Sequence, residues 1–189
     1  MSLQGISRPL LFRRRSLLGL ALLHGFSNLA WSQTGDGADE AHVKAAFLYK
    51  FTGYVDWPDS AFDNKADAPF VIGVQGSPPL LGELSQLITG RKVRERSVLV
   101  RKVQAGEPID GLHVLFMGRT EALRSGPPQP VLIVTEVEGD MPRGSMINFL
   151  LVERRVRFEI ALATVEKAGL RMSSRLLSVA QKVIQAEGR

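Results

Sequence analysis

Charged residues alternate with apolar ones over residues 156–160, where Arg157 and Glu159 fall two positions apart. Side chains two apart on a strand share a face, so this pair lies either on an edge strand or in a buried site. A buried ion pair must be hydrogen-bonded or hold a ligand, because desolvation costs several kcal/mol per ion. The spacing therefore leaves two interpretations open: a structural pair, bonded within itself or to Arg171, and a ligand pocket.

Other residue types that carry chemistry are few. His42 and His113 are the only histidines after residue 32, one in a helical pattern and one at the start of an apolar run. Cysteine is absent, which excludes disulfides, thiolate metal ligands and a cysteine nucleophile. The turn at 73–77 lacks the spacing of a nucleotide-binding loop, and Ser145 lacks the context of an acyl-transfer nucleophile. These residues therefore predict no metal and no cofactor, and they do not support an acyl-transfer enzyme.

The elements that must position these residues follow from hydrophobic periodicity. Short apolar runs at 70–74, 98–103, 113–117 and 131–135 predict strands covered on both faces. Ser77 and Pro78 open a helical stripe that ends before Gly90, which predicts a crossover helix and a parallel strand pair. The runs 146–152 and 156–161 are separated by only three residues, so they predict an antiparallel hairpin.

Helical patterns precede and follow these strands. The first begins at an Asp39 N-cap and ends before Pro58, and Leu48 and Tyr49 make it apolar on more than one side. It is either a core helix or a partner-binding or dimerising helix. Apolar residues at helical spacing over 172–184 predict a long C-terminal helix, entered through Ser173 or Ser174. The predicted fold class is a single three-layer α/β domain: a mixed, mostly parallel sheet flanked by helices, with a C-terminal antiparallel hairpin and that long helix.

The charge of the chain is concentrated at its N-terminus. The net charge is +5, but residues 1–32 hold four arginines and no acid, so 20 basic residues face 19 acidic ones in the rest. A basic cluster at 13–15, an apolar stretch at 17–23 and small residues near Ser32 predict a cleaved export signal, of which the twin-arginine type is one form. We predict a signal peptide at 1–32, a linker at 33–38, a domain at 39–189, and a periplasmic location without a nucleic-acid partner.

Several segments of the chain together resemble one known family. Residues 144–149 (GSMINF), 155–160 (RVRFEI) and 168–177 (AGLRMSSRLL) are similar to the C-terminal signature of the YfiR family. Residues 43–51 (VKAAFLYKF), with Trp57 and Pro58, and the strand at 70–74 are similar to its N-terminal half. The chain departs from the family in having no cysteine, which removes any thiol switch, and in Ala161, where the family pattern has asparagine.

The resemblance implies a non-catalytic exported regulator. Such a protein would bind and repress the sensor region of an inner-membrane signalling protein, a diguanylate cyclase first and a sensor kinase second, and so lower cyclic-di-GMP and biofilm formation. An outer-membrane lipoprotein would relieve the repression by sequestering the regulator. The alternative is a periplasmic small-molecule binding module that feeds a sensor or a transporter.

The residues of the resembling motifs are the candidate sites. A homodimer or a helix-mediated complex is expected to use the first helical segment and the tryptophan that follows it. The partner-binding candidates are Lys44, Phe47, Leu48, Tyr49, Phe51 and Trp57. The structural or ligand-pocket candidates are Asn148, Arg157, Glu159, Arg171, Ser173 and Ser174.

Overall fold

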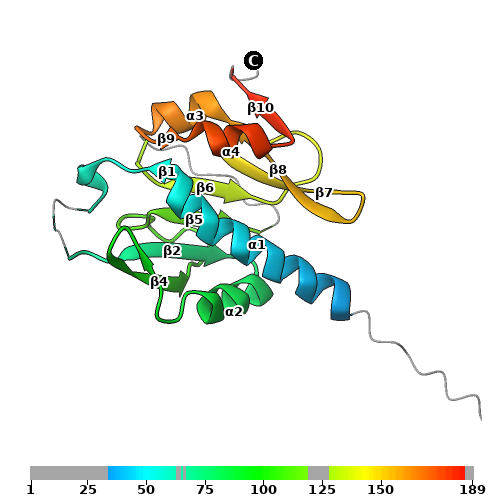
Figure 1. The fold of residues 1–189 in the computed structure, drawn as a ribbon, viewed down its shortest axis with the longest axis horizontal. Coiled ribbons are helices and arrows are strands. Elements are labelled where there is room, and N and C mark those ends of the chain that lie inside the picture. The colour runs from blue at the N-terminus through cyan, green and yellow to red at the C-terminus, as the bar shows by residue number, and fades with distance from the viewer. Residues whose placement is uncertain (1–33, 63–64, 66, 119–127, 186–189) are drawn as a thin grey trace, which may run out of the picture. The chain divides into compact units, whose positions relative to one another are not determined.

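The computed structural model describes residues 34–62, 65, 67–118 and 128–185, which build one mixed sheet with helices against it (Figure 1). Eight strands lie in the order β10-β8-β7-β6-β5-β2-β4-β3. Their bounds are β2 (Phe70–Gln75), β3 (Lys92–Val93), β4 (Arg96–Lys102), β5 (Val114–Met117), β6 (Leu132–Thr135), β7 (Ile147–Val152), β8 (Arg155–Ala161) and β10 (Lys182–Ile184). Two short strands, β1 (Val55–Asp56) and β9 (Arg171–Met172), pair with each other. The helices are α1 (Thr34–Tyr54), η1 (Asp59–Phe62), α2 (Pro78–Leu87), α3 (Leu162–Lys167) and α4 (Ser174–Val179).

The centre of the sheet is parallel, as the predicted crossover helix requires. Strands β4, β2, β5, β6 and β7 run parallel to one another, and β7 turns back through an antiparallel hairpin into β8. Every residue of β5 and β6 is buried, which is the pattern of strands covered on both faces. The predicted α/β class, with a mostly parallel sheet, flanking helices and a C-terminal hairpin, is confirmed.

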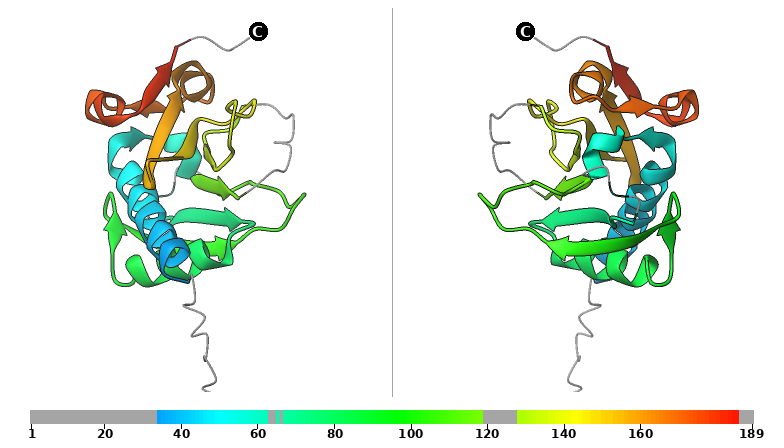
Figure 2. Two further views of the ribbon diagram at one scale, coloured as in Figure 1. Left: turned by 90° about the vertical axis from the view of Figure 1, so that its right-hand side faces the viewer. Right: turned by 90° about the vertical axis from the view of Figure 1, so that its left-hand side faces the viewer.

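Helix α1 runs diagonally across one face of the sheet, with α2 beside it (Figures 1 and 2). Phe51 of α1 is buried, and its ring centroid lies 5.9 Å from that of Phe149 in β7 and 5.1 Å from that of Phe158 in β8. Phe47, one turn earlier, contacts the same two rings. Full burial of a phenylalanine stabilises by about 1.5–3 kcal/mol, so this aromatic cluster fixes α1 on the hairpin.

Helix α2 covers the second apolar side of α1. The two helices pack along each other, His42 of α1 bonds Glu83 of α2 at 2.9 Å, and Leu80 and Leu84 of α2 are buried. Leu48 of α1 is fully buried within the domain. The sequence left open whether this helix is a core helix or a partner-binding or dimerising helix, and packing against α2 within the same chain favours the core helix.

The first helix begins earlier than the sequence indicated. Glycines at 35 and 37 favoured a linker at 33–38 with an N-cap at Asp39, yet α1 begins at Thr34 and places Asp39 inside the helix. Extending an existing helix by one residue costs much less free energy than nucleating a new helix. A well-packed helix therefore continues through residues of low helix propensity at its end. The predicted signal peptide at 1–32 lies outside the described residues.

The C-terminal segment differs from the predicted long helix. Ser173 is the N-cap of α4, as expected, but α4 has six residues, and Ala180 leaves it in an extended conformation with ψ 143°. Lys182–Ile184 then form β10, parallel to β8. Val183 and Ile184 are β-branched and favour strands, and an unpaired edge of β8 offers them ladder hydrogen bonds. Residues with helical spacing therefore divide between a short helix and an edge strand.

Candidate functional site

Asn148 is the centre of a buried polar cluster behind the hairpin. Its side chain is fully buried, and its amide group makes four hydrogen bonds. Oδ1 accepts from the Thr135 hydroxyl and from the Val137 N–H, both at 2.9 Å, while Nδ2 donates to the Val137 carbonyl at 3.0 Å and to Glu159 Oε1 at 3.1 Å. Ser145 completes the cluster through a 2.7 Å bond to Thr135. Asn148 thus bonds Val137 as a neighbouring strand would.

A buried lysine joins this region to α1. Lys44 lies on α1, is only 6% exposed, and bonds both Glu40, one turn earlier, and Glu136 at 2.7 Å. Glu136 directly precedes Val137, whose backbone is held by Asn148. Burial of an ammonium group requires such pairing, because an isolated charge is costly to desolvate. The contacts connect α1, the segment after β6, and the hairpin, so they fix the helix relative to β7 and β8.

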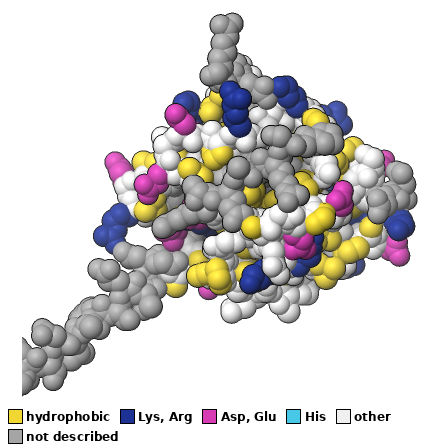
Figure 3. Space-filling model, turned by 180° about the vertical axis from the view of Figure 1, so that it is seen from behind, with side chains coloured by type: hydrophobic (Ala, Val, Ile, Leu, Met, Phe, Trp, Pro, Cys, Tyr) yellow, Lys and Arg dark blue, Asp and Glu magenta, His cyan; other side chains and the backbone are white. Residues whose placement is uncertain are grey.

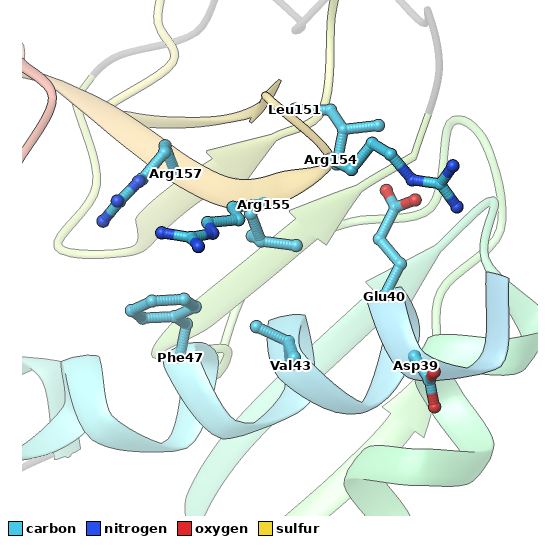
Figure 4. Close-up of a pocket in the computed structure, with 9 residues that line it drawn as sticks. Asp39, Glu40, Val43, Phe47, Leu151, Arg154, Arg155 and Arg157 are labelled. Carbon is cyan, nitrogen blue, oxygen red and sulfur yellow. The ribbon is translucent and has the colours of Figure 1, made fainter. Parts of the chain in front are cut away.

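An open cleft of about 550 Å³ lies between the N-terminal half of α1 and the hairpin (Figure 4). Helix α1 contributes Asp39, Glu40, Val43 and Phe47, and the hairpin contributes Leu151, Arg154, Arg155, Val156 and Arg157. Val43 is 39% exposed and Leu151 is 59% exposed, so both leave apolar surface open in the cleft. Figure 4 shows Arg155 and Arg157 projecting from the hairpin on one side of the cleft, and Val43 and Phe47 projecting from α1 on the other side.

The charges of the cleft are divided along its length. Arg155 and Arg157 lie along β8, while Glu40 and Arg154 meet at the end nearest the hairpin turn (Figure 4). In the described part of the chain, no carboxylate forms an ion pair with Arg155 or Arg157. The reverse side of the molecule shows acidic and basic side chains together with apolar ones (Figure 3). An apolar floor beside two unpaired arginines favours binding of an acidic partner.

The partner-binding candidates on α1 are mostly inside the protein. Lys44, Leu48, Phe51 and Trp57 are buried, and Phe47 and Tyr49 are half-buried. Trp57 donates its indole N–H to the His113 carbonyl at 3.0 Å, and the Tyr49 hydroxyl donates to the Lys92 carbonyl at 3.3 Å. Four of the six side chains therefore offer no surface in this chain. A part in partner binding stays a prediction, and Phe47, in the cleft, is the candidate best placed for it.

The second candidate set divides into three places. Asn148 and Glu159 are bonded in the polar cluster, whereas Arg157 is exposed in the cleft. The remaining three lie in β9 and at the start of α4: Arg171 is exposed opposite Asp56 in the β1–β9 pair, Ser173 caps α4 through the Leu176 N–H, and Ser174 is the first residue of α4. The prediction that Glu159 pairs with an arginine is wrong, because its side chain accepts a hydrogen bond from Asn148 instead.

Sequence reasoning missed several residues of both places. Thr135, Ser145 and Glu136 belong to the polar cluster and its lysine bridge, and Val43, Leu151 and Arg155 line the cleft. The polar residues at the ends of apolar runs were a usable signal, since Thr135 ends one run and Ser145 precedes another. The cleft gave a weaker signal, because it joins residues that are far apart in the chain.

Groups with catalytic chemistry do not converge at either place. His113 accepts the Val71 N–H at 3.0 Å through Nδ1, and its ring stacks against the rings of Phe62 and Phe70. Over the ranges that the structure describes, no three His, Asp or Glu side chains gather as metal ligands. No helix within those ranges is long and apolar enough to cross a membrane.

Comparison with known proteins identifies the chain by its family. A search of curated proteins gives no match. A family model described as YfiR/HmsC-like matches residues 41–181, which include most of α1, the cleft residues after Glu40 and the whole polar cluster. The match covers well over half of the chain. Proteins of this family are regulatory rather than catalytic, and membership supports a general role in the control of diguanylate cyclases. The chain therefore belongs to the YfiR/HmsC-like family.

Proposed function

We propose that this protein is a periplasmic repressor that binds the sensor region of an inner-membrane diguanylate cyclase and holds the cyclase inactive. Its activity lowers cyclic-di-GMP and with it biofilm formation. An outer-membrane lipoprotein that sequesters the protein relieves the repression. The observation that carries the proposal is the family match over residues 41–181, which spans α1, the hairpin and the cleft between them.

The geometry supports a binding protein. Two exposed arginines beside apolar surface suit contact with another macromolecule, and aromatic and arginine side chains contribute most to such interfaces. The buried cluster around Asn148 supports the alternative of a small-molecule module less well, because its amide bonds are all made to protein groups. No observation favours that second function.

Export is the part of the proposal that rests on residues 1–32. The arginine cluster at 13–15 and the apolar stretch at 17–23 have the order of an export signal. Intact-mass measurement of the protein in a periplasmic extract checks this, and we expect a chain that begins near Gln33. The full-length chain in the cytosol would contradict both the location and the repression of a periplasmic sensor region.

Gene deletion and complementation in the native host test the function itself. We expect deletion to raise cyclic-di-GMP, measured by mass spectrometry, and to increase biofilm. The full-length gene restores the low level. A matched gene lacking residues 2–32 makes the same domain without the leader and does not restore it. If deletion leaves cyclic-di-GMP unchanged under conditions in which the protein is made, the proposed function is wrong.

A further inference from the structure

The outer edge of β8 is open where it borders the cleft. Gln181 donates its N–H to the Phe158 carbonyl at 2.8 Å, so Phe158 directs its backbone polar groups toward the segment that enters β10. Residues two apart on a strand direct these groups to the same edge, so Val156 presents its N–H and carbonyl there as well. β10 pairs with residues 159–161, and among the described strands none pairs with this edge at Val156.

The hairpin turn leads independently to the same conclusion. Glu153 and Arg154 form a two-residue turn with φ values of 49° and 61°, and Val152 lies opposite Arg155. The residues that flank such a turn exchange hydrogen bonds with each other. Arg155 and Arg157 therefore bond inward to β7, and Val156, between them, bonds outward. An outward-facing edge of this kind is a template for an added strand.

The side chains beside this edge specify the chemistry of the added strand. Arg155 and Arg157 are exposed, and in the described residues no ion pair engages either. Because side chains on a strand repeat every two residues, carboxylates at alternate positions of an added strand align with the two arginines. Apolar side chains between those carboxylates point to the other face, toward Val43 and Phe47 in the cleft.

We infer that this cleft binds an extended acidic segment of the partner protein, which pairs as a strand with the outer edge of β8 at Val156. The inference rests on the proposed function, since it identifies how the repressor holds the periplasmic region of its cyclase. The arginines select carboxylates, the open backbone edge supplies sequence-independent hydrogen bonds, and Val43, Phe47 and Leu151 receive the apolar side chains.

A peptide probe tests the chemistry without the cyclase. The probe is a short fluorescein-labelled peptide that alternates Glu and Val, and the control peptide alternates Lys and Val. We expect fluorescence anisotropy to show binding of the Glu peptide alone, with an affinity that falls as salt is added. Equal binding of the two peptides, or no binding of either, overturns the inference.

Variants of the protein test the residues. The double change Arg155→Glu with Arg157→Glu is expected to weaken Glu-peptide binding about ten-fold or more, because two ion pairs become repulsions. Arg143→Glu is the matched control, since Arg143 is exposed outside the cleft. Val156→Pro removes the outward N–H and is expected to weaken binding about five-fold. Val156→Ala keeps that N–H and controls for the lost side chain.

Complementation of the deletion strain separates the two proposals. Suppose that deletion raises cyclic-di-GMP and that the arginine double variant restores repression as well as the wild type does. This result would support the proposed function and overturn the inference. Sedimentation addresses a second copy as occupant: a wild-type dimer that the double variant loses would assign the edge to self-association and overturn the acidic partner. Circular dichroism checks that each variant is folded. If Val156→Pro is unfolded, the arginine double variant alone tests the inference.

Discussion

Replacement of Asn148 by leucine is expected to lower the free energy of unfolding by about 3 kcal/mol, which is a large part of the usual 5–15 kcal/mol. Leucine has a similar size but makes no hydrogen bonds. The change leaves the Val137 N–H, the Val137 carbonyl and Glu159 Oε1 without the partner they have in the wild type. Each such group costs about 1–3 kcal/mol, at the lower end here because Val137 is only half-buried and water reaches it.

Urea titration followed by tryptophan fluorescence measures this loss. Trp57 is buried against Phe70 and is the only tryptophan after residue 32, so its emission reports unfolding of the domain. Thr135→Val is the graded control, expected to cost about 1 kcal/mol because it removes one hydroxyl of the cluster. A loss below about 1 kcal/mol in Asn148→Leu, with an unchanged urea slope, would refute the view that this amide fixes the segment after β6.

Four further substitutions test other parts of the structure. Lys44→Met is expected to lower stability by about 1–2 kcal/mol in a thermal melt, since it removes the buried ammonium group that bonds two partly exposed carboxylates. Leu48→Asp is expected to prevent folding, because it buries a charge, whereas Tyr49→Asp at a half-buried position stays folded in circular dichroism. The Gln104 N–H, and then Arg101, hold the pKa of Glu107 below its usual 4.5, so Glu107→Gln should be less stable than the wild type at neutral pH. Urea titrations at a series of pH values should show that difference fading below pH 4.5, as the wild-type carboxylate is protonated.

Each of these expectations has a contrary result. A Lys44→Met protein as stable as the wild type would mean that water already satisfies the two carboxylates. A folded Leu48→Asp protein would contradict the full burial of that side chain. A difference between Glu107→Gln and the wild type that grows as the pH falls would have the wrong sign for a depressed carboxyl pKa.

Local patterns sufficed where one short segment determines its own structure. The four apolar runs became β2, β4, β5 and β6, and the short link between the last two runs predicted the β7–β8 hairpin. The C-terminal residues show the limit of periodicity. Val183 and Ile184 fit a helical stripe, and only the position of the β8 edge in space makes a strand the better arrangement.

The candidate site was predictable in its residues more than in its geometry. The alternation around Arg157 and Glu159 correctly placed both on one strand, but a strand pattern does not state which end of it is covered. Glu159 is buried in the polar cluster, where it accepts from Asn148, whereas Arg157, two residues earlier on the strand, is exposed in the cleft. The polar cluster and the cleft depend on sheet register and on where α1 lies, and neither is a property of a single segment.

The hairpin turn that carries Glu153 and Arg154 has a consequence for anyone who wishes to engineer this domain. Left-handed backbone at a residue with a side chain costs about 1–2 kcal/mol, and Asn-Gly is the pair that such a turn prefers. Glu153→Asn with Arg154→Gly should therefore give a more heat-resistant protein. The same exchange removes a guanidinium from the rim of the cleft, so at this turn a gain in thermal tolerance comes at the expense of recognition.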